Sequence, residues 1–192
     1  GYSCMDGTFT FYRGIFISWF CAINDCGFCF FSTNKNNKRE ISRRNPASIY
    51  AEAIIGKELG WGHGFLSGGI GSYNKEDLVK LCKNVSMIIG KKIWLNIGPL
   101  SSDYLDALHP YVEGIVGSIE TVDKDLHKKI CPSKPIEPFV RMYREAEKRG
   151  IKKGMTFIVG IGESQHDYDA LKQFLLDNKI DRFYCYSLVP QK

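Results

Sequence analysis

The chain has 192 residues, 44% hydrophobic and 24% charged, an ordinary globular composition long enough for one sizeable hydrophobic core. Its 26 basic and 21 acidic residues leave a net charge of +5 that is spread along the sequence, so we expect no nucleic-acid partner. The longest apolar run near the start, residues 14–23, is about half a membrane span and is followed by no cleavage pattern, so we expect a cytoplasmic protein without membrane contact.

Apolar runs of strand length alternate with segments of helical period. We expect strands at residues 14–20, 64–67, 92–97, 114–119, 155–159 and 182–188. Helices are expected at about 46–59, 75–89, from Ser101 or Ser102 onward, 137–148 and 166–178. The start of the first helix is signalled by Asn45 as N-cap and Pro46 as the first helical residue. The second helix is expected to start after Asn74 and to stop at Gly90. Residues 33–45 are expected to form a polar loop, and the segment with Cys131, Pro132 and Pro135 a longer turn.

Six strands separated by five helices predict parallel strands, because each crossover helix returns the chain to the same edge. A doubly wound open sheet and a βα barrel both fit this order. The regular rhythm and the glycines that follow the strands favour the barrel. A closed eight-stranded barrel typically needs about 250 residues. We therefore expect an α/β fold, a partial (β/α)6 TIM-type barrel in a single domain over 1–192, with C-terminal strands missing from a longer barrel.

Three of the seven cysteines, Cys21, Cys26 and Cys29, directly follow the first strand. Cysteines clustered in this way indicate metal rather than disulfides, in a reducing compartment. Three thiolates hold three irons of a [4Fe-4S] cluster and leave the fourth iron open to a substrate or cofactor. A structural zinc ion needs four ligands, for which Cys4 or His63 is the nearest further candidate. The spacing alone leaves three alternatives: an iron-sulfur cluster, a zinc ion or a loop that binds no metal. The other cysteines fit buried small hydrophobes.

A strand, a cysteine triplet with the aromatic Phe28 before its last member, and a βα barrel together resemble the radical S-adenosylmethionine (SAM) superfamily over nearly the whole chain. The spacing of four then two differs from the usual three then two and points to a divergent subgroup. Further motifs fall on successive strand ends, where a barrel builds its site. By resemblance, cofactor contacts are implied for Ser67, Gly68 and Gly69 at the methionine amino group, Ser118 and Glu120 at the ribose, and Ile158, Gly160 and Glu163 at the adenine.

The resemblance implies an enzyme with a [4Fe-4S] cluster and SAM as cofactors and Cys21, Cys26 and Cys29 as cluster ligands. It also implies a 5′-deoxyadenosyl radical that abstracts hydrogen from a substrate, and a reducing partner such as ferredoxin or flavodoxin. We expect a small-molecule or protein-bound acyl substrate. Asn96, Lys134 and Arg141 are candidates to bind it, because amide and cationic groups suit a carboxylate or phosphate. Lys134 and Arg141 are equally compatible with ordinary surface charges.

Within the superfamily the pattern most resembles biotin synthase and lipoyl synthase, and hence a transferase of cofactor biosynthesis. Biotin synthase proper is disfavoured, because the positions of its auxiliary-cluster cysteines carry Phe65 or Leu66, Trp94 and Gly154 here. The enzyme of the iron-hydrogenase cofactor and methylornithine synthase are relatives without that cluster. The alternative from another class is a zinc-stabilised α/β binding module without catalysis. A flavodoxin-like nucleotide binder is disfavoured, because the cysteines occupy its phosphate loop.

Overall fold

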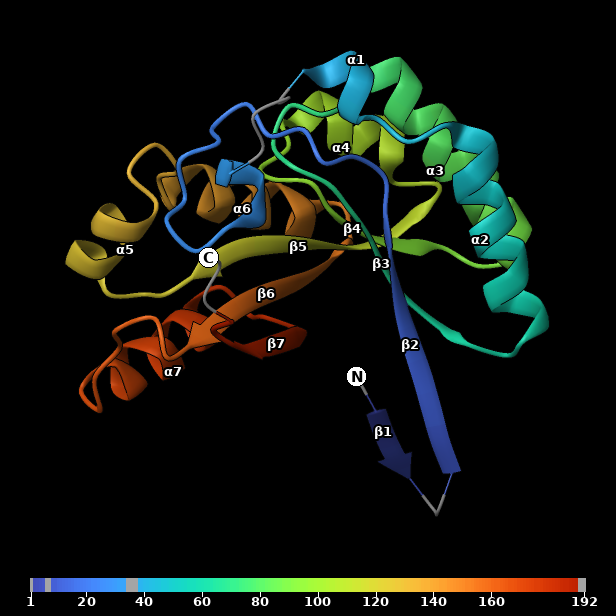
Figure 1. Ribbon diagram of the computed structural model, residues 1–192. Coiled ribbons are helices and arrows are strands. Elements are labelled where there is room, and N and C mark those ends of the chain that lie inside the picture. The colour runs from blue at the N-terminus through green and yellow to red at the C-terminus, as the bar shows by residue number, and fades with distance from the viewer. Residues whose placement is uncertain (1, 6–7, 34–37, 190–192) are drawn as a thin grey trace.

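The computed structural model describes residues 2–5, 8–33 and 38–189, and seven strands form one sheet. The strand order follows the sequence, so each strand pairs with the next along the chain (Figure 1). The first pair is antiparallel and the five pairs from β2 to β7 are parallel. The strands are β1 Tyr2–Met5, β2 Thr8–Phe16, β3 Gly62–Ser67, β4 Ile93–Asn96, β5 Val112–Glu120, β6 Lys152–Val159 and β7 Arg182–Ser187. Six parallel strands in this order form a half-barrel, which confirms the predicted partial barrel.

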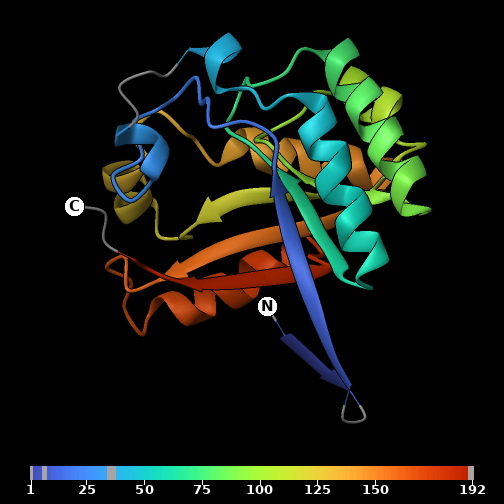
Figure 2. The same cartoon turned by 45° about the vertical axis from the view of Figure 1, so that its right-hand side comes forward.

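Helices connect the parallel strands and cover one face of the curved sheet (Figures 1 and 2). They are α1 Arg39–Ser42, α2 Pro46–Glu58, α3 Lys75–Ile89, α4 Ser102–Leu108, α5 Lys124–Ile130, α6 Glu137–Lys148 and α7 Asp167–Asp177. The core lies between them and the sheet, where alternate strand residues such as Ile15, Leu66, Leu95 and Ile115 are almost fully buried. Within the described ranges, none of these helices combines the length and apolar character that a membrane span requires.

The predicted start and stop signals of the helices are confirmed. The side chain of Asn45 accepts a hydrogen bond from the backbone N–H of Ala47, with Pro46 as the first residue of α2. Asn74 caps α3 in the same way through the N–H of Asp77, and Gly90 ends that helix in the left-handed conformation. These local interactions explain why both helices begin and end where the sequence predicts.

The first predicted strand, residues 14–20, differs from the observed one. β2 begins at Thr8 and ends at Phe16, because the chain then leaves the sheet to pair with α1. Beyond Phe16, the N–H of Trp19 and the hydroxyl of Ser18 both donate to the carbonyl oxygen of Ser42, at 3.0 and 3.2 Å. The sequence analysis also missed β1, α1 and α5. The last of these precedes the predicted turn and is capped by Asp123, which accepts from the N–H of Leu126 at 2.6 Å.

On the face of the sheet away from the core helices, the ring of Trp94 packs over two glycines. A Cβ atom at Gly114 would lie 2.5 Å from the indole of Trp94, and one at Gly154 would lie 3.1 Å from it. The two glycines of β5 and β6 thus make room for the ring from β4. The guanidinium carbon of Arg182 lies 4.1 Å from the centre of that indole. The side chains of Trp94 and Arg182 therefore stack on each other near the amino ends of the strands.

Candidate functional site

The loop with the three cysteines is fixed on both sides by backbone hydrogen bonds. The N–H of Ala22 donates to the carbonyl of Ile70, behind β3, and the N–H of Gly27 donates to the carbonyl of Ile130, at the end of α5, both at 2.8 Å. Gly69 packs so closely that a Cβ there would lie 2.1 Å from the carbonyl oxygen of Phe20. The glycine pair after β3 and the cysteine loop are therefore in direct contact, as the predicted site requires.

The three thiols of this loop are neighbours. Burial raises the pKa of Cys29 most, and the thiols of Cys26 and Cys21 raise it further. Among the described residues, no three His, Cys, Asp or Glu side chains converge on a single metal ion. A tetrahedral zinc site needs such convergence, whereas a cubane does not, because each thiolate binds a different iron. Three thiolates are a donor set that a [4Fe-4S] cluster can use, one for each of three irons, whereas a structural zinc ion needs four ligands.

The further ligand candidates for zinc lie at the amino-end halves of β2 and β3. His63 lies at the start of β3, where its ring contacts Gly56 of α2. Cys4 pairs in the β1–β2 register with Phe9, near the start of β2, whereas the cysteine loop follows the end of that strand. The backbone of both candidates therefore lies at the amino ends of β2 and β3, whereas the cysteine loop follows the carboxyl end of β2.

Cys131, which the sequence left without a role, lies against the cysteine loop. It is 1% exposed at the end of α5, and its thiol lies close to that of Cys26. The interaction with Cys131 and burial raise the pKa of Cys26, whereas the interaction with Cys26 lowers the pKa of Cys131. Sequence distance hid this pair, since 105 positions of chain separate the two residues.

Glu120 points into the inner face from a distorted end of β5. The pairing of β5 with β6 shifts between Ser118 and Glu120, and Glu120 has a φ of 68°. A bulge of this kind re-aims a side chain, and a left-handed backbone in a residue other than glycine is typical of functional sites. The carboxylate accepts hydrogen bonds from the Nζ of Lys134 at 3.1 Å and the hydroxyl of Thr156 at 3.0 Å. Glu120 is therefore held firmly at the carboxyl edge of the strands.

Lys134 links Glu120 to the cysteine loop. Its side chain is 7% exposed, which rules out the surface charge that the sequence left open, and its Nζ lies 5.7 Å from the centre of the Phe28 ring. Burial alone would lower the pKa of Lys134, but the acidic groups around it, Glu120 foremost, raise it above its usual range. Lys134 is thus a buried ammonium ion between two parts of the predicted site.

A cavity of about 840 Å³ opens on the inner face of the sheet. Polar side chains from four adjacent strands line it: Ser67, Asn96, Ser118, Glu120 and Thr156. The hydroxyl of Ser118 donates to the side-chain oxygen of Asn96 at 2.9 Å, so two predicted residues are in contact. Aromatic side chains of β2, β3 and β7 form the remaining walls, including Phe65 and Tyr184, whose rings meet edge to face at 5.4 Å. A largely apolar cavity with a few convergent polar groups is typical of a small-molecule site.

The predicted residues behind β6 take a different arrangement. Ile158 is 8% exposed on the strand. The carboxylate of Glu163 accepts hydrogen bonds from the N–H groups of Gly160, Ile161 and Gly162, at 2.7, 2.9 and 3.2 Å. The N–H of Gly160 is the main reason that the pKa of Glu163 is lowered. Glu163 therefore holds the shape of this loop.

Arg141 does not join the group. It is exposed on α6 and lines cavities on the outside of the half-barrel. Sequence reasoning also missed contributors to the inner cavity, among them Tyr184 and Tyr186 of β7. The alternating pattern of β7 was the signal for them, since every second side chain faces inward.

The family model of the Radical SAM superfamily matches residues 15–175. The chain belongs to the radical SAM superfamily. Members of this superfamily are enzymes that use a [4Fe-4S] cluster and SAM, and these are therefore the cofactors of this radical SAM domain.

The uncharacterized protein MJ0597 of Methanocaldococcus jannaschii is 35% identical over 188 residues, 96% of this chain and 52% of that protein. The structure of methylornithine synthase (PylB) superposes with a TM-score of 0.82 at 21% identity, over 95% of this chain and 55% of PylB. That of Streptococcus suis SuiB bound to the precursor peptide SuiA gives a TM-score of 0.71 at 18% identity, over 94% and 40%. These two share the fold. The chain spans about half the length of the curated relative, so the activity of the whole protein is a proposal.

Proposed function

We propose that this radical SAM domain holds its cluster through Cys21, Cys26 and Cys29 and positions SAM against a substrate in the inner cavity. When bound, the cluster and SAM supply an electron and a 5′-deoxyadenosyl radical that abstracts hydrogen from the substrate. The observation that carries the proposal is the contact of Gly69 with the cysteine loop, together with the Glu120–Lys134–Phe28 connection. These two sets of contacts bring the segments that follow β2, β3 and β5 close together.

Different residues bind different parts of SAM in this proposal. Backbone groups of Ser67, Gly68 and Gly69 bind its amino group, which the contact of Gly69 with the cysteine loop supports. Glu120 is an acceptor for the ribose hydroxyls, since the hydrogen bonds from Lys134 and Thr156 fix its carboxylate in place. The backbone around Ile158 and Gly160 remains our proposal for the adenine, with Glu163 holding the loop. The aromatic walls exclude water from the reacting carbon.

Asn96 and Ser118 of the same cavity are our candidates for binding the substrate. Asn96 and Ser118 form a hydrogen-bonded pair that presents polar groups to a substrate. We infer a small molecule or a protein-bound acyl group, in a reaction of cofactor biosynthesis of the biotin synthase, lipoyl synthase or iron-hydrogenase-cofactor type. Cysteines clustered at a metal site are typical of a reducing compartment, and we infer a cytoplasmic location.

Metal analysis of two matched variants tests the cluster assignment. The protein, purified and reconstituted without oxygen, should carry about four irons and four sulfides per chain and release 5′-deoxyadenosine from SAM under a chemical reductant. Cys26→Ala should lose the iron and the cleavage. Cys131→Ala removes the thiol that touches Cys26 and should keep the full iron content, because three thiolates suffice. A colourless protein loaded with zinc would refute the proposal, and loss of iron from Cys131→Ala would refute the three-thiolate set.

A further inference from the structure

A second cavity, of about 730 Å³, opens on the outside of the half-barrel between α5, α6 and α7. Its rim is cationic: Lys124 and Lys128 of α5 and Arg141 and Arg144 of α6 are all exposed. Glu137 is the acidic residue in its lining. We call this cavity the basic groove. Its four cations against one carboxylate make it a positive patch on a protein of mild net charge.

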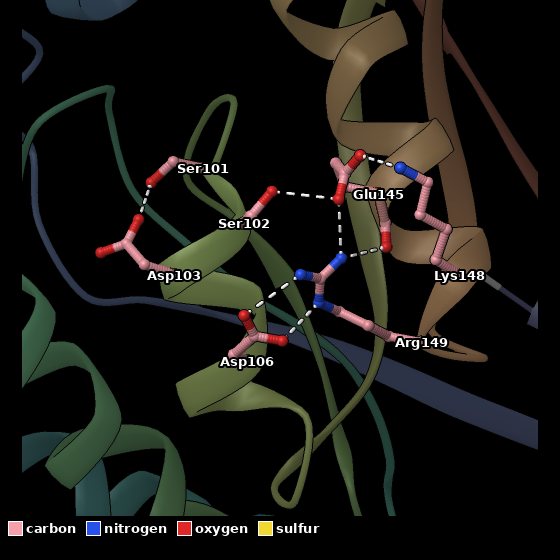
Figure 3. Close-up of polar contacts among 7 residues, drawn as sticks. All are labelled: Ser101, Ser102, Asp103, Asp106, Glu145, Lys148 and Arg149. Carbon is pink, nitrogen blue, oxygen red and sulfur yellow. Dashed lines mark hydrogen bonds and ion pairs between the residues drawn. The ribbon is translucent and has the colours of Figure 1, made fainter.

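The four cations of the basic groove stand outside the ion pairs of the described part of the chain. Over the residues that the structure describes, none of the four takes part in an ion pair. The C-terminal end of α6 behaves differently, since Glu145 pairs with Lys148 and with Arg149, the residue after the helix (Figure 3). Arg149 is also paired with Asp106 of α4. Arg141 and Arg144 in the middle of the same helix are outside these pairs and are exposed, so their charge faces solvent.

The basic groove adjoins the cysteine loop through Cys131. This residue lines the groove, and its thiol lies close to that of Cys26. The backbone contact between Gly27 and Ile130 joins the same two segments, and Figures 1 and 2 both draw the chain after β2 beside α5. The basic groove is therefore a part of the outer surface that lies next to the cysteine loop. It lies on the side of that loop away from the inner cavity.

We propose that the basic groove docks a small electron-carrier protein with an acidic face, which delivers the electron that the domain consumes. The reduced carrier gives up one electron and becomes oxidised, and the cluster behind Cys26 is reduced by that one electron. This inference rests on the proposed function, because only an enzyme that cleaves SAM needs such a delivery. Exposed cations spread over two helices suit the electrostatic steering of a weak, short-lived protein complex. A site for a small anion would instead need buried donors that converge on one point.

Stopped-flow reduction of the full-length holoprotein tests the docking. The probe is a reduced ferredoxin of strongly negative charge, and the readout is the loss of the visible absorbance of the cluster. Lys128→Glu with Arg144→Glu reverses two cations of the groove. Lys80→Glu with Lys83→Glu is the matched control, since both lysines are exposed on α3. At low salt the rate of cluster reduction in the groove variant should be lower than in the wild type by roughly tenfold or more. The control should react at the wild-type rate, and added salt should slow the wild type.

A neutral reductant separates the failure of docking from the failure of function. Photoreduced deazariboflavin should reduce the wild type and both variants equally and give equal 5′-deoxyadenosine from SAM. A groove variant that ferredoxin reduces as fast as the wild type overturns the docking, as does an equal slowing of both variants. Competition by inorganic phosphate at constant ionic strength would make the groove a small-anion site and also overturn it. Normal ferredoxin reduction without any 5′-deoxyadenosine refutes the proposed function and leaves the docking intact.

Discussion

Gly69→Ala places one methyl group between the glycine pair and the cysteine loop. The new Cβ would lie 2.1 Å from the carbonyl oxygen of Phe20, and 2.6 and 2.7 Å from the Cβ and Cα of Cys21. Real Cβ atoms do not approach closer than 3.0 Å, so the loop has to retreat by about 0.9 Å or more. Backbone atoms form most of this contact, so no change of side-chain rotamer relieves it. Overpacking of this kind typically costs about 1–3 kcal/mol, and we expect the upper end.

Two assays measure the effect of Gly69→Ala. Urea unfolding of the cluster-free protein should give a free energy of unfolding lower by roughly 2–3 kcal/mol. Iron content after reconstitution should fall too, because the displaced loop carries Cys21. Gly27→Ala is the matched control within the loop, since its Cβ would meet nothing closer than 3.9 Å. It should unfold within about 1 kcal/mol of the wild type. Wild-type stability and iron content in Gly69→Ala would refute the close contact on which the site rests.

Two further predictions concern charged groups. Lys134→Met leaves the buried carboxylate of Glu120 without its ion-pair partner and should lower the free energy of unfolding by roughly 3 kcal/mol, whereas Lys134→Met with Glu120→Gln should lose less. An equal loss in urea unfolding of the single and double variants would contradict the ion pair. Hydrogen bonds from Lys148 and Arg149 lower the pKa of Glu145 to about 2, so its stabilising effect is full above the ordinary value of 4.5 and is lost as the pH falls toward 2. Carbon-13 NMR titration of that carboxyl should locate the midpoint, and the stability difference between wild type and Glu145→Gln should shrink over the same range.

The fold was predictable where its signals are local. Asn45 and Asn74 predict the starts of two helices, and their own side chains cap those helices. Gly90 ends the second of them with a left-handed backbone conformation that glycine adopts readily. The end of the first strand was not predictable in this way. The apolar run continues past Phe16, but the pairing of Ser18 and Trp19 with Ser42 draws the chain out of the sheet. That pairing depends on α1, which lies 20 or more positions along the chain.

The site shows the same division between local and distant interactions. The cysteine triplet is a signal carried by neighbours in sequence, and it led to the superfamily that the family match confirms. The burial of Lys134 depends on Glu120 having a left-handed backbone at a bulge, which no residue pattern announces. The contact of Cys131 with Cys26 likewise follows from how α5 packs beside the loop. Sequence therefore identified the chemistry, and only the packing revealed the groups that surround it.

The indole of Trp94 fills the space that Gly114 and Gly154 leave between neighbouring strands. This packing lies toward the amino ends of the strands, because Trp94 pairs with Gly114 near the start of β5 and its ring stacks on Arg182, the first residue of β7. The cysteine loop follows β2 at the opposite, carboxyl ends. A variant that changes the fit between ring and glycines therefore perturbs the half-barrel at the end remote from the proposed cofactor residues.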